Sequence, residues 1–130
     1  MDALILSCGT GGGHNSAGKA ISEELKARNH HAVMINPYIL CGHRLAEKID
    51  SLYINTASLA PKAFGAVYQA GELYRKMPFR SPVYYANSRM AEIMAEYLAE
   101  HHFDIVIMPH LFPAEILTNM KHQGRKVPAT

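Results

Sequence analysis

The sequence predicts an α/β fold in which helices flank a parallel sheet. Three observations support this class: short apolar runs of strand length, helical periodicity between these runs, and a glycine-rich turn that joins the first run to the first helix. The runs are apolar along their whole length rather than alternating, which is typical of parallel strands buried on both faces. We therefore expect a Rossmann-like sheet.

The first strand, turn and helix define the opening of this fold. Residues 3–6 form an apolar run, and Ala17, Ile21 and Leu25 recur every fourth residue behind it. This pattern predicts a strand followed by a helix that ends near residues 29–30. The turn between them has four glycines within residues 9–13. Glycine lets the backbone approach a ligand closely, and the free N–H groups at the start of a helix favour negative charge.

His14 stands at the junction between the turn and the helix. An imidazole, with an ordinary pKa near ~6.5, is well suited to move a proton close to neutral pH. The same position also suits a histidine that only caps the helix. The residues alone leave both interpretations open.

The rest of the chain alternates between helical and strand-like segments. Apolar runs at 32–35, ended by Asn36 and Pro37, and at 103–109 predict the second and third strands. Two helices are predicted from apolar faces: one face is Leu45, Ile49, Leu52 and Tyr53, and the other is Met90, Ile93, Met94, Tyr97 and Leu98. Two more helices are predicted at residues 61–74 and 112–121, and a proline-rich break is expected at 77–82. A turn at 123–126 precedes an apparent fourth strand at 127–130, so we expect one half or less of a larger protein.

Composition narrows the class of protein. The chain has 130 residues, of which 48% are hydrophobic and 18% charged, as in one globular domain. A formal net charge of +2 is too small to indicate nucleic acid as a partner. Cys8 and Cys41 have neither a disulfide nor a metal-binding pattern, and no run is long enough to span a membrane. We expect a soluble intracellular domain.

Two nucleotide-binding motifs are nearly matched, and both fail. Residues 13–20 resemble a P-loop, but Ala20 replaces the Ser or Thr that would hold magnesium, and Lys19 falls inside the periodic helix as a surface lysine. A dinucleotide fingerprint would need a glycine where His14 stands and an acidic residue where Asn36 ends the second strand.

The other histidines fall into two groups. His110 follows the third strand, at the carboxyl edge where open α/β sheets bind ligands, so it is expected to converge with His14 on one crevice. The remaining candidates lie at predicted helix ends, where solvent or the helix dipole accounts for them; they are His30, His31, His101 and His102. No spacing indicates zinc.

The middle of the chain is basic and aromatic. Between Lys62 and Arg89 the single acidic side chain is Glu72, among tyrosines, Phe79 and several cations. Such a stretch fits a surface that faces anionic lipid. Taken by itself, it fits slightly better a solvated helical hairpin whose tyrosines pack inward.

Two separated motifs, in order, resemble the monogalactosyldiacylglycerol synthase family and its bacterial relatives, the processive diacylglycerol glucosyltransferases. The first is residues 4–7 running into Gly11-Gly12-Gly13-His14-Asn15-Ser16-Ala17. The second is 104–110, DIVIMPH, followed by FPAE at 112–115, with a basic turn and Val127-Pro128 beyond it. The resemblance spans nearly the whole chain.

This resemblance implies the N-terminal, acceptor-side domain (residues 1–130) of an inverting GT-B glycosyltransferase, which transfers a hexose from a UDP-sugar to diacylglycerol. His14 would be the catalytic base or part of its relay, without a metal or a cofactor. The implied substrate contacts are Gly11, Gly12, Gly13, Asn15 and His110, and the implied lipid-facing residues are Tyr74, Arg75, Lys76, Phe79 and Arg80.

The same resemblance places the protein in the cytoplasm, peripherally on the inner face of the cell membrane, and favours the lipid-facing interpretation of the middle segment. A nucleotide-sugar domain would follow Thr130, so this chain alone is expected to be inactive. The alternatives are a stand-alone nucleotide-binding or regulatory Rossmann-like module, and a purely structural α/β domain.

Overall fold

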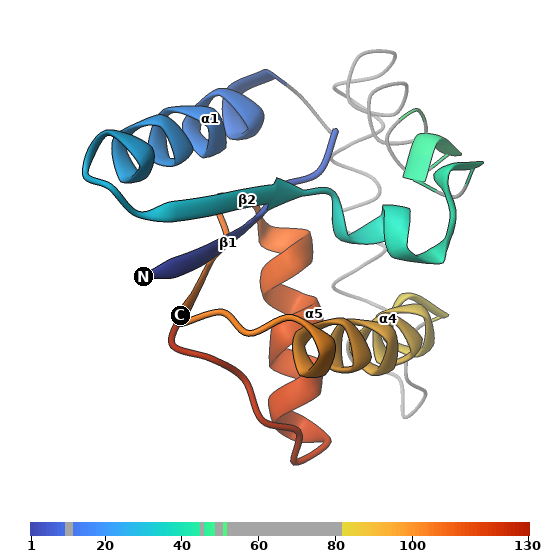
Figure 1. Ribbon diagram of the computed structural model, residues 1–130. Coiled ribbons are helices and arrows are strands. Elements are labelled where there is room, and N and C mark those ends of the chain that lie inside the picture. Colours follow the sequence, from blue (N-terminus) through green and yellow to red (C-terminus); the bar gives the residue numbers. More distant parts are fainter. Residues whose placement is uncertain (10–11, 45, 49–50, 52–81) are drawn as a thin grey trace.

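A computed structural model describes residues 1–9, 12–44, 46–48, 51 and 82–130 (Figure 1). In chain order the elements are β1 (Asp2–Leu6), α1 (Gly12–Ala27), β2 (His31–Ile35), the 3-10 helix η1 (Pro37–Cys41), α4 (Pro82–Glu100), β3 (Ile105–Ile107) and α5 (Leu111–His122). The helices predicted around Leu45–Tyr53 and at 61–74 lie outside the described residues, apart from a few isolated positions.

The described sheet is parallel and has the strand order β2-β1-β3. In its register Ala3 lies opposite both Ala32 and Ile105. The three predicted strands are confirmed, as is the Rossmann-like class, although β3 is shorter than the predicted run. Beyond α5, Ala129 forms an isolated parallel bridge with Ile105, so the predicted fourth strand is present as one bridged residue.

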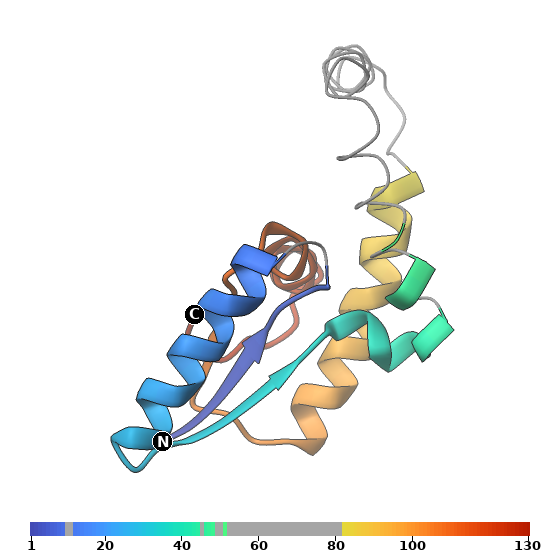
Figure 2. The ribbon, with the colours of Figure 1, turned by 90° about the horizontal axis from the view of Figure 1, so that it is seen from above.

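Strand β1 is the centre of the core because helices cover both of its faces. Its residues Ala3, Leu4, Ile5 and Leu6 are all 0% exposed. In Figures 1 and 2, α1 lies along one face of the sheet, and Figure 1 places α4 and α5 on the other. Strand residues alternate between the faces, so Leu4 and Leu6 join the cluster with α4 and α5, while Ile5 lies beneath α1.

Helix α1 packs through small residues rather than through the predicted face. Gly18 and Ser22 are buried, Ile21 and Leu25 are half-buried, and Ala17 is exposed, so the prediction for Ala17 is wrong. The reason is close packing: a Cβ atom on Gly18 would lie 3.0 Å from the Cε of Met34 in β2. A glycine at this position lets the helix approach the sheet.

The opposite layer is apolar with a polar seam. Met94 of α4 and both Ile116 and Met120 of α5 are fully buried there. Of the predicted apolar face of α4, Met90, Met94, Tyr97 and Leu98 belong to this core, whereas Ile93 is half-buried outside it. Across the seam, buried Asn87 of α4 donates from Nδ2 to Glu115 Oε2 of α5 at 2.9 Å. A satisfied polar pair of this kind fixes how two apolar faces are aligned.

The described residues also bear on two features raised by the composition, the cysteines and the possibility of a membrane-spanning helix. In the described part of the chain neither Cys8 nor Cys41 forms a disulfide. Among the helices in the described ranges, none is both long and apolar enough to cross a membrane.

Candidate functional site

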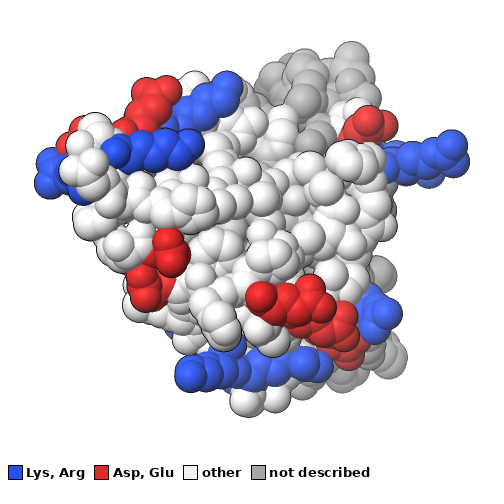
Figure 3. Space-filling model, in the orientation of Figure 1, with Lys and Arg blue, Asp and Glu red and all other residues white. Residues whose placement is uncertain are grey.

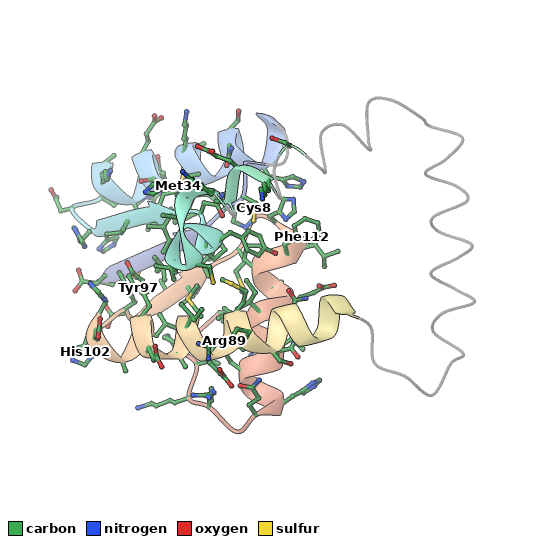
Figure 4. All side chains as sticks on the ribbon, turned by 90° about the vertical axis from the view of Figure 1, so that its right-hand side faces the viewer. Cys8, Met34, Arg89, Tyr97, His102 and Phe112 are labelled. Atoms are coloured by element: carbon green, nitrogen blue, oxygen red, sulfur yellow. The ribbon has the colours of Figure 1, made fainter. Side chains whose placement is uncertain are left out.

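The candidate site lies where β1 and β3 end side by side. The chain leaves β1 for β2 on one side and returns to β3 on the other, so the carboxyl ends of β1 and β3 form the topological switch point at which such sheets bind ligands. Figure 4 shows this end of the sheet, where Cys8 follows β1 and Phe112 begins α5; Tyr97 and His102 lie at the opposite end. We call this place the switch-point crevice.

His14 faces across this crevice from the first turn of α1. Its Nδ1 lies 2.8 Å from the carbonyl oxygen of Pro109, which follows β3, and the residue is exposed. A carbonyl oxygen can only accept, so Nδ1 donates and, in the neutral ring, Nε2 keeps the lone pair. The helix-cap interpretation of His14 is therefore wrong: the ring bonds a neighbouring strand end rather than an N–H group of its own helix.

His110 meets His14 in the crevice, as predicted. Their ring centroids are 4.5 Å apart with an interplanar angle of 75°, an edge-to-face contact. His110 is only 5% exposed and is the N-cap of α5, because its Nδ1 accepts the backbone N–H of Phe112 at 3.1 Å. The centroid of the Phe112 ring lies 4.8 Å from that of His110. The sequence interpretation had not foreseen this capping role.

The end of β1 is joined to α1 by a side-chain hydrogen bond. Buried Ser7 donates its hydroxyl to Asn15 Oδ1 at 2.7 Å. The oxygen of Asn15 thus holds the helix start to the strand, while its amide N–H groups are the donors for any substrate contact. Asn15 was predicted to bind substrate, and its position in the crevice is compatible with that prediction.

Gly12 and Gly13 open a space at the start of α1. A Cβ atom on either would meet nothing within 4 Å, and neither has the positive φ that favours glycine. Alanine is the better helix former, so neither packing nor backbone conformation explains glycine there. The space beside these two glycines is open. Gly11, the third predicted glycine contact, lies outside the described residues.

Charged side chains of both signs lie on the surface of the protein. Figure 3 shows Lys, Arg, Asp and Glu mainly around the margin of one face, with both signs mixed. Lys19 is exposed, which agrees with a surface lysine rather than a P-loop lysine. In the ranges that the structure describes, no group of three potential ligands could hold a metal ion.

The shifted pKa values belong to groups elsewhere in the fold. Burial raises the pKa of the Cys41 thiol, opposed in part by Arg89, and burial also raises the pKa of Tyr97. Hydrogen bonding to Glu92 raises the pKa of exposed Arg89.

The histidines predicted at helix ends do not join the site. His101 contacts the Tyr97 carbonyl at 3.0 Å near the end of α4, His31 lies 3.4 Å from an Asp2 carboxylate oxygen, and His30 contacts the Met1 amine. These contacts agree with surface roles, although His31 is the first residue of β2 rather than part of a helix end.

A cavity of about 490 Å³ lies away from the crevice, beside the amino end of β3. Its lining includes Leu98, His102, Phe103, Arg125 and Lys126. We place the candidate site at the switch-point crevice rather than at this cavity, because the rings of His14 and His110 meet in the crevice.

Some predicted residues cannot be placed, and some contributors were not predicted. Tyr74, Arg75, Lys76, Phe79 and Arg80 lie outside the described residues. Sequence reasoning missed Ser7, the Pro109 carbonyl and Phe112. A serine just after an apolar strand was a usable signal for Ser7, whereas a backbone carbonyl leaves no signal in the sequence.

Comparison with known proteins identifies the family of the chain. The family model described as monogalactosyldiacylglycerol (MGDG) synthase matches residues 14–130, a range that includes both His14 and His110. No curated protein and no solved structure matches the chain. The chain belongs to the monogalactosyldiacylglycerol synthase family, a family of glycolipid glycosyltransferases.

Proposed function

We propose that this chain is the acceptor-side domain of a GT-B glycosyltransferase that transfers a hexose from a UDP-sugar to diacylglycerol with inversion. The observation that supports it best is the exposed His14 ring, held by the Pro109 carbonyl so that Nε2 is the basic nitrogen. The second half of such an enzyme would supply most of the nucleotide-sugar contacts.

In the proposed reaction His14 acts as the general base. Nε2 takes the proton of the acceptor hydroxyl while that oxygen forms a bond to the anomeric carbon. The bond from this carbon to the phosphate oxygen breaks on the opposite face, and UDP leaves with the electron pair. As His14 becomes positive, its Nδ1–H···O=C bond to Pro109 becomes charge-assisted and stabilises the cation.

The open start of α1 would hold the polar part of the substrates. Gly12 and Gly13 leave room above the first turn, and the first N–H groups of a helix, which have no partner within the helix, favour negative charge. A diphosphate or the glycerol oxygens of the acceptor would fit there beside His14. Ser7 and Asn15 would keep this turn in register with β1.

The acceptor is a lipid in this proposal, so the enzyme would work at a membrane surface. The basic, aromatic segment that contains Tyr74, Arg75, Lys76, Phe79 and Arg80 would contact the anionic inner face. Neither a metal nor a cofactor is required by the proposed chemistry, and nucleic acid is not a proposed partner.

Kinetics of His14→Ala in the full-length enzyme test the proposal. Loss of a general base is expected to lower kcat by about 10²–10⁴-fold, with UDP-sugar binding nearly unchanged. Lys19→Ala is the matched control, since Lys19 is exposed on the same helix and its loss is expected to leave kcat unaltered. Weaker UDP-sugar binding with unchanged kcat in His14→Ala would reject the base role. A loss with Lys19→Ala would instead favour a phosphate-binding module.

A further inference from the structure

The two histidines of the crevice have different nitrogens committed to backbone hydrogen bonds. In His14, Nδ1 must carry the proton, because its partner at 2.8 Å is the Pro109 carbonyl. In His110, Nδ1 must carry the lone pair, because it accepts the Phe112 N–H at 3.1 Å. In their neutral forms the rings are therefore opposite tautomers, with the proton of His110 on Nε2.

His110 is itself held in place. Its ring is 5% exposed, it caps α5 through Nδ1, and the Phe112 ring contacts it at 4.8 Å with an interplanar angle of 61°. His14 is exposed and packs edge-to-face on this ring at 4.5 Å, so the buried His110 ring limits how far the His14 ring can rotate.

We infer that His110 is a positioning residue which, together with the carbonyl of Pro109, fixes the ring orientation and the tautomer of His14. The carbonyl places the proton on Nδ1, and the His110 ring keeps His14 turned so that the bond is made. The inference rests on the proposed function for its kinetic consequence, because only a base needs Nε2 free and correctly aimed. The tautomers themselves do not depend on the proposed reaction.

Two substitutions separate ring packing from helix capping. His110→Asn keeps a side-chain oxygen that accepts the Phe112 N–H, since Asn is a favoured N-cap, but it removes the ring from His14. His110→Phe keeps an aromatic ring against His14 and removes the acceptor. If His110 acts by positioning, His110→Asn lowers kcat by about 10–100-fold with KM nearly unchanged, as a small misplacement of a catalytic group does. His110→Phe, which keeps the ring contact with His14, then lowers kcat less than His110→Asn does.

The direct test is ¹⁵N–¹H NMR of the full-length protein labelled with [¹⁵N]histidine. The expected result is the Nδ1–H tautomer for His14 and the Nε2–H tautomer for His110, with His14 becoming a mixture of tautomers in His110→Asn. An Nε2–H tautomer for His14 in the wild-type protein overturns the inference without any variant. So does a His110→Asn variant that folds and retains both the His14 tautomer and wild-type kcat.

The outcomes also separate this inference from the proposed function. If His14→Ala leaves kcat unchanged, the base role of His14 is rejected, and the assignment of the tautomers is then tested by NMR alone. If His14→Ala is inactive and His110→Asn is fully active, the base role survives and the positioning role fails.

Discussion

Replacing Gly13 with alanine is expected to make the protein more stable and the enzyme less active. Gly13 lies in the first turn of α1 without a positive φ, and a Cβ atom there would meet nothing within 4 Å. The added methyl group therefore clashes with no other atom in the free protein. In the proposed complex it occupies the space through which the ligand approaches the backbone next to His14.

The magnitude follows from helix propensity. Alanine in place of glycine inside a helix stabilises the fold by about 0.5–1 kcal/mol, and at a first-turn position we expect the lower part of that range. For a chain of this length, about 0.5 kcal/mol raises Tm by roughly 1–3 °C. The assay combines thermal unfolding with kcat/KM of the full-length enzyme, where we expect a loss of about tenfold or more, equivalent to at least ~1.4 kcal/mol.

Gly18→Val on the same helix is the matched control. Its Cβ would lie 3.0 Å from Met34 Cε and 3.5 Å from Ile5 Cγ2, so the larger side chain overpacks the contact between α1 and the sheet and costs about 1–3 kcal/mol. A Gly13→Ala protein that is more stable and fully active would show that no ligand uses the open space. A less stable Gly13→Ala protein would refute the geometric argument itself.

Two further predictions concern pH and membranes. Burial raises the folded-state pKa of Cys41 above 9.0 and that of Tyr97 above 10.0. The stability that these groups contribute is complete below their unfolded pKa values and is lost as pH rises through the folded ones. Tm should therefore fall as pH rises above about 9, and it should fall less steeply in Cys41→Ala and Tyr97→Phe. If Tm falls with pH equally steeply in those variants, other titrating groups cause the fall. Co-sedimentation of the protein with vesicles is expected to need anionic lipid, to weaken at high salt, and to weaken when Arg75, Lys76 and Arg80 are neutralised. If vesicle binding depends neither on salt nor on these substitutions, the basic segment is not the part of the protein that contacts the membrane.

Much of the fold could be predicted from local patterns in the chain. The apolar run at 3–6 is buried on both faces of the sheet, which leaves a continuous rather than alternating signal. The parallel order also made the meeting of His14 and His110 predictable, because both follow strands whose carboxyl ends share one edge. In contrast, Ala17 was wrongly predicted to lie on the buried face of α1. That face is set by the close approach of Gly18 to Met34, which belongs to a strand that follows the helix in the chain, so the periodicity of the helix alone does not reveal it.

The sequence by itself determined the parallel α/β class, the position of the glycine-rich helix start and the two histidines at strand ends, because each depends on short-range periodicity and spacing. Only the tertiary structure decided what those histidines do to one another. The Pro109 carbonyl assigns the proton of His14, and the Phe112 N–H assigns that of His110. Backbone groups are the same at every residue, so their choice of partner appears only once strands and helices are packed.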